Sequence, residues 1–248
     1  MMRAPALLLL ALASTASATE IEVGYGHEYL THDYASWNTA YIEADWKRAD
    51  RAAAGLVVRE LGRYGQRDLE LGTSATLPIG RRWDISAELG GSPTHSVVAS
   101  WKGGLQLQCV LGGGFVALSG LHVSRFENEA QISVPVVGRG GLDWYWGSHR
   151  LAWTGFLATL AGAWSGSQRA AWDIFYREGD RIGAAVAVGR ELESLGAGRL
   201  LATDVISAMV AGRNGIGRGW SVTYELGVQR QGDLYLRAGA TLGLRRHF

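Results

Sequence analysis

Residues 233–248, the last sixteen of the chain, read DLYLRAGATLGLRRHF, and their apolar and polar side chains alternate. One parity is apolar and consists of Leu234, Leu236, Ala238, Ala240, Leu242, Leu244 and Phe248. The other includes Asp233, Tyr235, Arg237, Thr241, Arg245 and His247. A period of two residues places these two sets on opposite faces of one β-strand. A strand of this kind with an aromatic residue at its end is typical of the last strand of an outer-membrane β-barrel.

The first eighteen residues have the pattern of a secretory signal peptide. Arg3 supplies a positive charge, residues 6–13 are apolar but too short to span a bilayer, and Ala16-Ser17-Ala18 matches a cleavage site of small residues. No cysteine follows the apolar segment, so this is not a lipoprotein signal. We therefore expect a signal peptide over residues 1–18, cleavage near Ala18, and an outer-membrane β-barrel domain over residues 19–248.

The composition of the mature chain fits a barrel. Loss of Arg3 leaves 23 of the 24 basic residues against 23 acidic ones, and a net charge near zero argues against nucleic-acid binding. The 10 Trp and 9 Tyr residues are enough for aromatic girdles at the two membrane interfaces. No segment after residue 18 reaches the length of a transmembrane helix, so a membrane-embedded chain would have to be a closed barrel.

Segments with the same two-residue period recur between turn residues and predict about fourteen strands of roughly 11 residues each. They are residues 20–30, 37–48, 53–61, 66–77, 83–91, 101–109, 115–126, 130–145, 150–163, 172–177, 182–188, 200–211, 220–229 and 233–248. Residues 53–61 and 200–211 alternate least clearly, and merging them with their neighbours would leave twelve strands. The predicted fold class is all-β: a single antiparallel up-and-down transmembrane barrel of 14 strands, with 12 as the alternative.

An even number of strands places both chain ends on the periplasmic side. The turns expected there are 49–51, 78–81, 111–114, 146–149, 179–180 and 212–218. The loops expected on the extracellular side are 31–36, 62–65, 91–97, 126–130, 164–168, 190–199 and 230–232. A soluble all-β domain is the alternative class, which alternation alone does not exclude.

Several short motifs occur in a characteristic order. They are Gly24-Tyr25, the segment from Arg59 through Arg63-Tyr64-Gly65-Gln66-Arg67-Asp68, Ser92-Pro93, Tyr145-Trp146-Gly147-Ser148-His149-Arg150 and Gly189-x-Glu191. In this order they resemble the YaiO-like outer-membrane β-barrel family, over most of the mature chain. His149 departs from the family pattern, which has Tyr there. The resemblance implies an outer-membrane barrel and no settled activity, so it names no substrate.

Thirteen residues are candidates for contacts with the lumen or with a ligand, most of them because they have the inward parity of their strand. They are Arg59, Arg63, Tyr64, Arg67, Asp68, Glu70, Asp84, Glu88, Lys102, Asp173, Arg177, Glu225 and Arg237. At 14 strands a barrel is too wide for side chains alone to fill easily, which favours a water-filled channel.

The densest charged segment among them runs from Arg59 to Glu70. Arginine offers planar paired donors to carbohydrates or anions, which would make the segment a recognition site at the extracellular mouth. The alternative is an interior ladder of ion pairs, because lumen charges of mixed sign are common in barrels. Arg59 and Asp68 share the inward parity near one end of adjacent strands, so we expect them to pair.

Catalysis is the competing class of function. A hydrolase would need a nucleophile, a histidine base and a third orienting group. His122 and Ser124 lie two residues apart on one strand face, but none of the six histidines stands in a recognised motif. There is also no phosphate loop, redox motif or zinc-ligand spacing, so we predict no catalytic residue, no cofactor and no metal.

The leading functional hypothesis is a passive pore or a surface-binding barrel for polar solutes, with saccharides as one class. The alternatives are a lipid- or glycan-modifying outer-membrane enzyme, or a structural barrel associated with polysaccharide export machinery. We expect the barrel to contact outer-membrane lipid and lipopolysaccharide in a Gram-negative bacterium. Its C-terminal strand, which ends at Phe248, is expected to be recognised by the barrel-assembly machinery.

Overall fold

The structure is a computed structural model that describes residues 19–48, 51–128, 131–196 and 199–248. The predicted signal peptide lies outside the described residues. The strands are β1 (Glu20–Leu30), β2 (Trp37–Lys47), β3 (Ala53–Arg63), β4 (Gln66–Ile79), β5 (Trp83–Gly91), β6 (Trp101–Gly112), β7 (Phe115–Asn128), β8 (Gln131–Ser133), β9 (Val136–Trp146), β10 (His149–Leu160), β11 (Ala163–Arg177), β12 (Asp180–Gly196), β13 (Arg199–Gly217), β14 (Trp220–Gln231) and β15 (Tyr235–His247). Among the described residues, no helix is long and apolar enough to cross a membrane.

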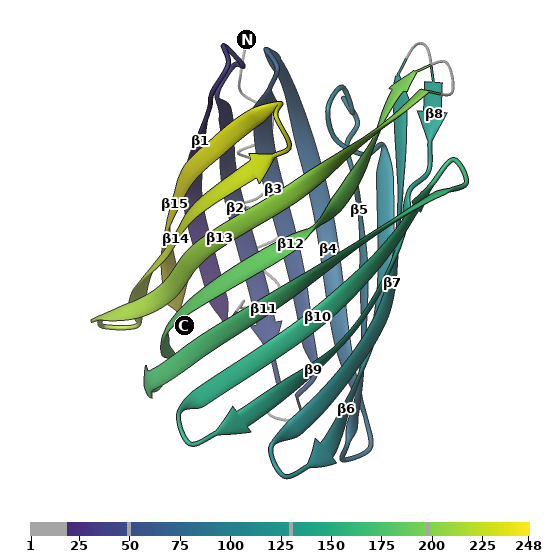
Figure 1. Cartoon of the computed structure of the whole chain (residues 1–248). Coiled ribbons are helices and arrows are strands. Elements are labelled where there is room, and N and C mark those ends of the chain that lie inside the picture. Colours follow the sequence, from purple (N-terminus) through teal and green to yellow (C-terminus); the bar gives the residue numbers. More distant parts are fainter. Residues whose placement is uncertain (1–18, 49–50, 129–130, 197–198) are drawn as a thin grey trace.

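Fourteen of the described strands form one closed antiparallel barrel (Figure 1). Each strand pairs with its neighbours in the chain, β7 pairs with β9, and β1 pairs with β15 to close the ring. The short β8 pairs only with the end of β7, as an extension beyond the barrel. The prediction of a 14-stranded up-and-down barrel is confirmed, and both uncertain segments are separate strands, β3 and β13.

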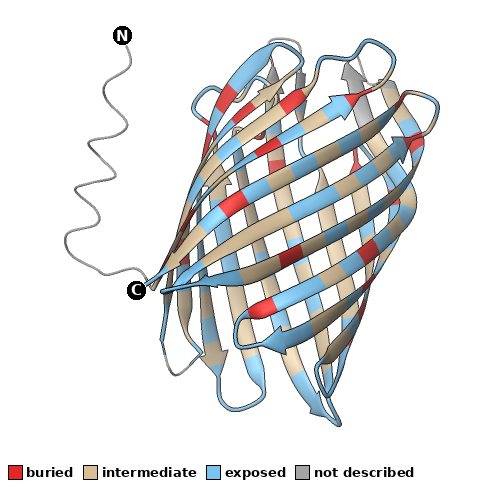
Figure 2. Cartoon of the chain, turned by 90° about the vertical axis from the view of Figure 1, so that its left-hand side faces the viewer, coloured by how far each residue is buried: buried red, intermediate tan, exposed pale blue. Residues whose placement is uncertain are grey.

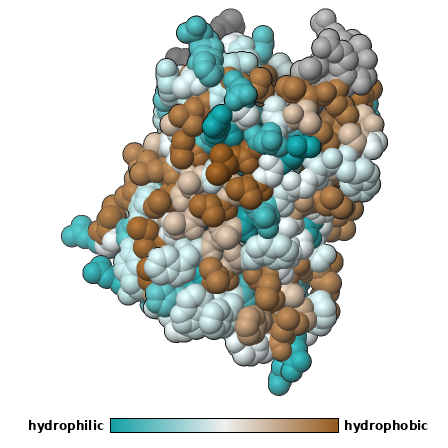
Figure 3. All heavy atoms as spheres, in the orientation of Figure 1, coloured by the Kyte–Doolittle hydropathy of each residue, from teal (hydrophilic) through white to brown (hydrophobic). Residues whose placement is uncertain are grey.

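Burial follows the two-residue period, with the polarity expected of a membrane barrel. In β15, Leu242 on the outer face is 62 % exposed, whereas Tyr235 on the inner face is 6 % exposed. Along many strands, exposed positions alternate with intermediate ones, and buried positions occur at scattered places (Figure 2). Hydrophobic residues spread over the outer wall, and strongly hydrophilic residues appear at both rims (Figure 3). The outer wall can therefore face lipid while polar side chains gather in the lumen.

Several predicted boundaries were wrong, first of all around residues 130–145. That segment is not one strand but β8 and β9, separated at Val134-Pro135. Proline has no N–H to donate to the ladder and ends the pairing there. The predicted loop 164–168 is strand instead, because the tight turn comes earlier, at Ala161 (φ 50°) and Gly162 (φ 83°). A two-residue hairpin turn with positive φ at both positions needs little sequence signal beyond one glycine.

The predicted loop 190–199 and turn 212–218 were also too long. β12 continues to Gly196, β13 begins at Arg199 and runs to Gly217, and the turn that follows is Arg218-Gly219. Beyond the apolar band the outward positions become charged: Arg190 Nε donates to Asp204 Oδ1 at 3.1 Å on the exposed face. Pairing therefore continues where the apolar alternation has stopped, so the pattern underestimates the strand lengths.

Candidate functional site: the charged lumen

Glu22 and Arg245 form the centre of an ion-pair network near the end of the barrel that holds both termini. They are partners in the β1–β15 register, and Arg245 Nε donates to Glu22 Oε2 at 2.5 Å. Arg245 Nη1 reaches Glu20 Oε2 at 2.6 Å. Glu22 Oε1 accepts further bonds from the Tyr41 hydroxyl at 2.6 Å and the Thr223 hydroxyl at 2.7 Å. Four strands on both sides of the closing pair are thus joined through one buried carboxylate.

A cavity of about 510 Å³ lies beside this network, inside the barrel. Its charged lining residues are Glu22, Arg181, Arg213, Glu225 and Arg245. Arg181 and Arg213 lie directly opposite each other on β12 and β13. Arg213 Nε donates to the Gly179 carbonyl at 2.7 Å, and Arg213 Nη1 lies 3.7 Å from Glu20 Oε1. No ion pair of Arg181 is found within the described part of the chain. Like charges in opposed positions destabilise a strand pair, so this wall of the cavity is a place where an anion would be favoured.

A second group of lumen charges joins β3, β4 and β6. Glu70 Oε1 accepts from Arg59 Nη1 at 2.9 Å, and Glu70 Oε2 accepts from Lys102 Nζ at 2.8 Å. The expected pairing of Arg59 with Asp68 was wrong. The β3–β4 hairpin turns at Tyr64-Gly65, which places Arg59 opposite Glu70. This network is the interior ladder that the sequence offered as the alternative to a recognition site.

Asp68 fastens the loop between β5 and β6. Its side chain is 1 % exposed, and its carboxylate accepts three backbone N–H bonds, from Ser96 at 2.9 Å, Val97 at 2.6 Å and Val98 at 3.0 Å. Because Asp68 has the inward parity of β4, these bonds hold the tip of the loop between β5 and β6 on the inner side of the wall. The loop is therefore held toward the lumen, at the end of the barrel opposite the one that holds the termini.

Trp37 brings together Arg63, Tyr64 and Arg237 near the same end of the barrel. The guanidinium carbons of Arg63 and Arg237 lie 4.6 and 4.9 Å from the centre of the Trp37 ring, and the Tyr64 ring meets it edge-on at 5.4 Å. Trp37 is buried on the inner face. It is not among the candidate lumen residues predicted from the sequence. Its apolar inward position breaks the alternation, which is the signal that could have identified it.

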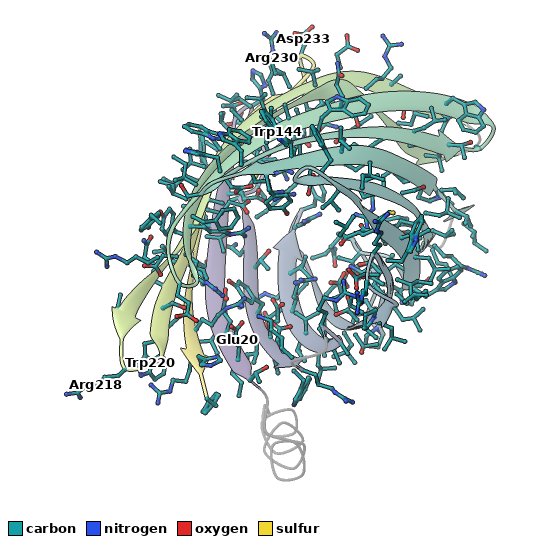
Figure 4. The ribbon with its side chains drawn as sticks, turned by 90° about the horizontal axis from the view of Figure 1, so that it is seen from below. Glu20, Trp144, Arg218, Trp220, Arg230 and Asp233 are labelled. Carbon is teal, nitrogen blue, oxygen red and sulfur yellow. The ribbon has the colours of Figure 1, made fainter. Side chains whose placement is uncertain are left out.

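The other predicted contacts lie at several separate places. Asp173 Oδ2 accepts from Arg150 Nη1 at 3.0 Å, and Asp84 Oδ2 lies 3.4 Å from Arg51 Nη1. Arg177 is exposed at the C-terminal end of β11. Glu88 and Glu225 face the lumen, and Figure 4 shows how side chains from the surrounding strands project from the wall on both sides.

Arg67 is a correction to the predicted set. It is 82 % exposed and pairs with Glu60, 54 % exposed, at 3.2 Å. Its parity is that of Leu69 and Leu71, which are exposed on the outer wall. Arg67 therefore lies on the outer surface near the rim and does not line the lumen. No group of three or more metal-ligating side chains occurs among the described residues.

The family model of the YaiO membrane beta barrel domain matches residues 18–191. The chain belongs to this family. No curated protein matches its sequence. Solved structures with the same fold include the monoaromatic hydrocarbon channel CymD, which is 11 % identical with a TM-score of 0.60, over 100 % of this chain and 93 % of that one.

Two further neighbours of the YaiO barrel come from named bacteria. Omp33 of Acinetobacter baumannii is 14 % identical with a TM-score of 0.54, over 93 % of this chain and 99 % of that one. An anion-selective porin from Comamonas acidovorans is 8 % identical with a TM-score of 0.52, over 94 % and 99 %. At such low identity the likeness shows the fold alone. Family and neighbours together place the YaiO barrel in the outer membrane.

Proposed function

We propose that this YaiO barrel is a passive pore for polar solutes, saccharides among them, in the outer membrane of a Gram-negative bacterium. The observation that carries the proposal is the cavity of about 510 Å³ inside the barrel, whose walls hold side chains of both signs. A lumen lined in this way holds water and favours hydrophilic solutes. The loop fastened by Asp68 would set the narrowest part of the mouth.

Arg181, which has no carboxylate partner among the described residues, adds a preference for anions. Arg181 and Arg213 face the cavity from opposed positions, and a passing carboxylate or phosphate would relieve their repulsion. Arginine suits this role because its planar donors match such groups. Glu22 pairs with Arg245 and Glu20 with Arg213, so Arg181 is the cation on this wall that an anion would pair with.

Conductance across a planar bilayer tests the proposal. Purified wild-type protein is expected to give steady conductance, and a salt gradient is expected to show higher permeability for chloride than for potassium. Arg181→Gln together with Arg213→Gln should reduce that preference. Arg218→Gln is the matched control, because Arg218 lies at the tip of the β13–β14 hairpin, outside the lumen (Figure 4). Absence of conductance from correctly folded protein would contradict a pore and favour a surface-binding barrel.

The route to the membrane is part of the same proposal. Cleavage near Ala18 would release a mature barrel starting at Thr19, and the strand that ends at Phe248 would be recognised by the barrel-assembly machinery. Lipid and lipopolysaccharide would then cover the apolar outer wall. Mass spectrometry of the purified protein should find Thr19 at the N-terminus, and deletion of Phe248 should reduce the amount of heat-modifiable barrel in the outer membrane.

A further inference from the structure

Three polar side chains on the inner face of β5 and β7 form a continuous hydrogen-bonded row. Ser124 Oγ lies 2.9 Å from His122 Nε2, and His122 Nδ1 lies 2.9 Å from Glu88 Oε1. Serine, imidazole and carboxylate in this order, joined through the two different ring nitrogens, are the arrangement of a hydrolytic triad. Neither the ion-pair ladder nor a pore requires such a row.

The Glu88 carboxylate determines which ring nitrogen of His122 carries the proton. An ionised Glu88 can only accept, so Nδ1 of neutral His122 carries the ring proton and donates it to Glu88. Nε2 is then unprotonated and accepts the hydroxyl proton of Ser124. This tautomer is the one in which His122 can act as a general base toward the serine hydroxyl.

Gly104 is the reason why Glu88 can reach His122 across an intervening strand. Glu88 is opposite Gly104 in the β5–β6 register, and Gly104 is opposite His122 in the β6–β7 register. A Cβ atom on Gly104 would lie 2.5 Å from Glu88 Oε1. A glycine at this position leaves open the space through which the carboxylate crosses β6. The row therefore depends on a specific residue in each of three neighbouring strands.

The surroundings of Ser124 suit a small polar substrate. Ser124 is 8 % exposed, and Lys102 lies opposite it in the register, held by Glu70 at 2.8 Å. A cavity of about 170 Å³ adjoins the row, with Glu88 and Lys102 on its wall. Its wall is largely polar, with Glu43, Arg59 and Glu70 besides Glu88 and Lys102, and Ser124 lies next to it and not on its wall. A cavity of ~150 Å³ holds a molecule the size of benzene, so this space has room for a short acyl group. Because the row faces the lumen, the substrate arrives from water and not from the bilayer.

We propose that Ser124, His122 and Glu88 hydrolyse carboxylic esters of polar alcohols that carry a short acyl group. Ser124 Oγ attacks the ester carbonyl carbon while His122 Nε2 takes the hydroxyl proton. The bond to the alcohol oxygen then breaks, and the alcohol leaves with the proton from His122. Water attacks the acyl-serine, again giving its proton to His122, and the carboxylic acid leaves as Ser124 is regenerated. Glu88 is a positioning residue that orients His122, and Lys102 supplies positive charge beside the carbonyl oxygen.

Labelling with a fluorophosphonate probe tests the nucleophile in the full-length barrel in detergent. We expect mass spectrometry to find the probe on Ser124 of the wild type. His122→Gln should slow labelling at least ~100-fold, the lower range for loss of a general base. Ser207→Ala is the matched control, because Ser207 is a lumen-facing serine on β13 and its loss should leave the labelling of Ser124 unchanged. Labelling of Ser124 that is unaffected by His122→Gln, or no labelling of correctly folded wild type, would overturn the proposal.

Hydrolysis of p-nitrophenyl acetate tests the rest of the row. Ser124→Ala should abolish it. Glu88→Gln should lower kcat about 10-fold or more and change the pH profile of kcat, whereas a loss of folded protein lowers kcat by the same factor at every pH. Gly104→Ala changes none of the three residues of the row, but its Cβ would displace the Glu88 carboxylate. This variant should therefore lower kcat by a similar factor. Heat-modifiable gel mobility confirms that each variant is folded. Wild-type rates in both the Ser124→Ala and Gly104→Ala proteins would show that the row is structural only.

Discussion

Replacing Glu70 by glutamine is expected to destabilise the barrel by about 1–3 kcal/mol. Glu70 is 8 % exposed and accepts from both Arg59 and Lys102, so the neutral amide would leave two cations without their shared counter-ion. Removal of one partner from a fully buried pair costs ~3–5 kcal/mol. The expected value is smaller because the two cations are themselves partly exposed to the lumen and can be hydrated.

Urea-induced unfolding of the barrel in phospholipid vesicles, followed by tryptophan fluorescence, measures this difference. Glu60→Gln is the matched control, because Glu60 also pairs with an arginine of the β3–β4 hairpin but on the exposed outer surface. Exposed pairs contribute ~0–1 kcal/mol, so the control should unfold almost as the wild type does. Equal unfolding midpoints for the two variants would refute the reasoning that burial in the lumen gives the Glu70 network its strength.

Four other substitutions test the wall and the mouth of the barrel. Leu226→Arg should lower the free energy of unfolding by ~2–4 kcal/mol in the same assay, since the arginine would enter the lipid near the bilayer midplane. Glu225→Arg, on the lumen face, should lower it much less. The reverse order would mean that the two faces of β14 are misassigned. Asp68→Ala should expose the loop that it fastens to protease and raise conductance, because three backbone N–H groups lose their acceptor; an unchanged cleavage rate would contradict this. Gly24→Ala should lower the free energy of unfolding by ~1–3 kcal/mol, since the alanine Cβ would lie 2.3 Å from the ring of Tyr41. A stability equal to that of the wild type would show that the Tyr41 ring moves aside freely.

The two-residue period predicted the faces of most strands correctly, since that period depends only on local geometry. The period predicted less well which residues lie opposite each other on neighbouring strands. Arg59 and Asp68 both face inward, but the turn at Tyr64-Gly65 fixes the register two residues away from the pairing expected. A shift of two residues preserves parity, so alternation carries no information about it.

Contacts between side chains on different strands are harder still to predict from a sequence pattern. His122 and Ser124 are visible as neighbours because they lie on one strand, but Glu88 joins them only through two successive registers and the open space at Gly104. Arg181 and Arg213 meet in the same way, by the register of β12 and β13. Each such contact depends on turn geometry at positions far from the residues that meet.

The position of the Glu22 network at the closure of the ring has a consequence for the order of folding. Arg245 and Glu22 are separated by 223 residues along the chain, and Thr223 and Glu22 by 201. Contacts between such distant segments have the highest entropic cost and form late, whereas each hairpin can form as soon as its two strands are present. A growing or truncated chain therefore has two unpaired edges and, in β1, a Glu22 carboxylate without its arginine partner. The arrival of the last strand removes all three at once, so completion of the ring is a cooperative step that an incomplete chain is unable to take.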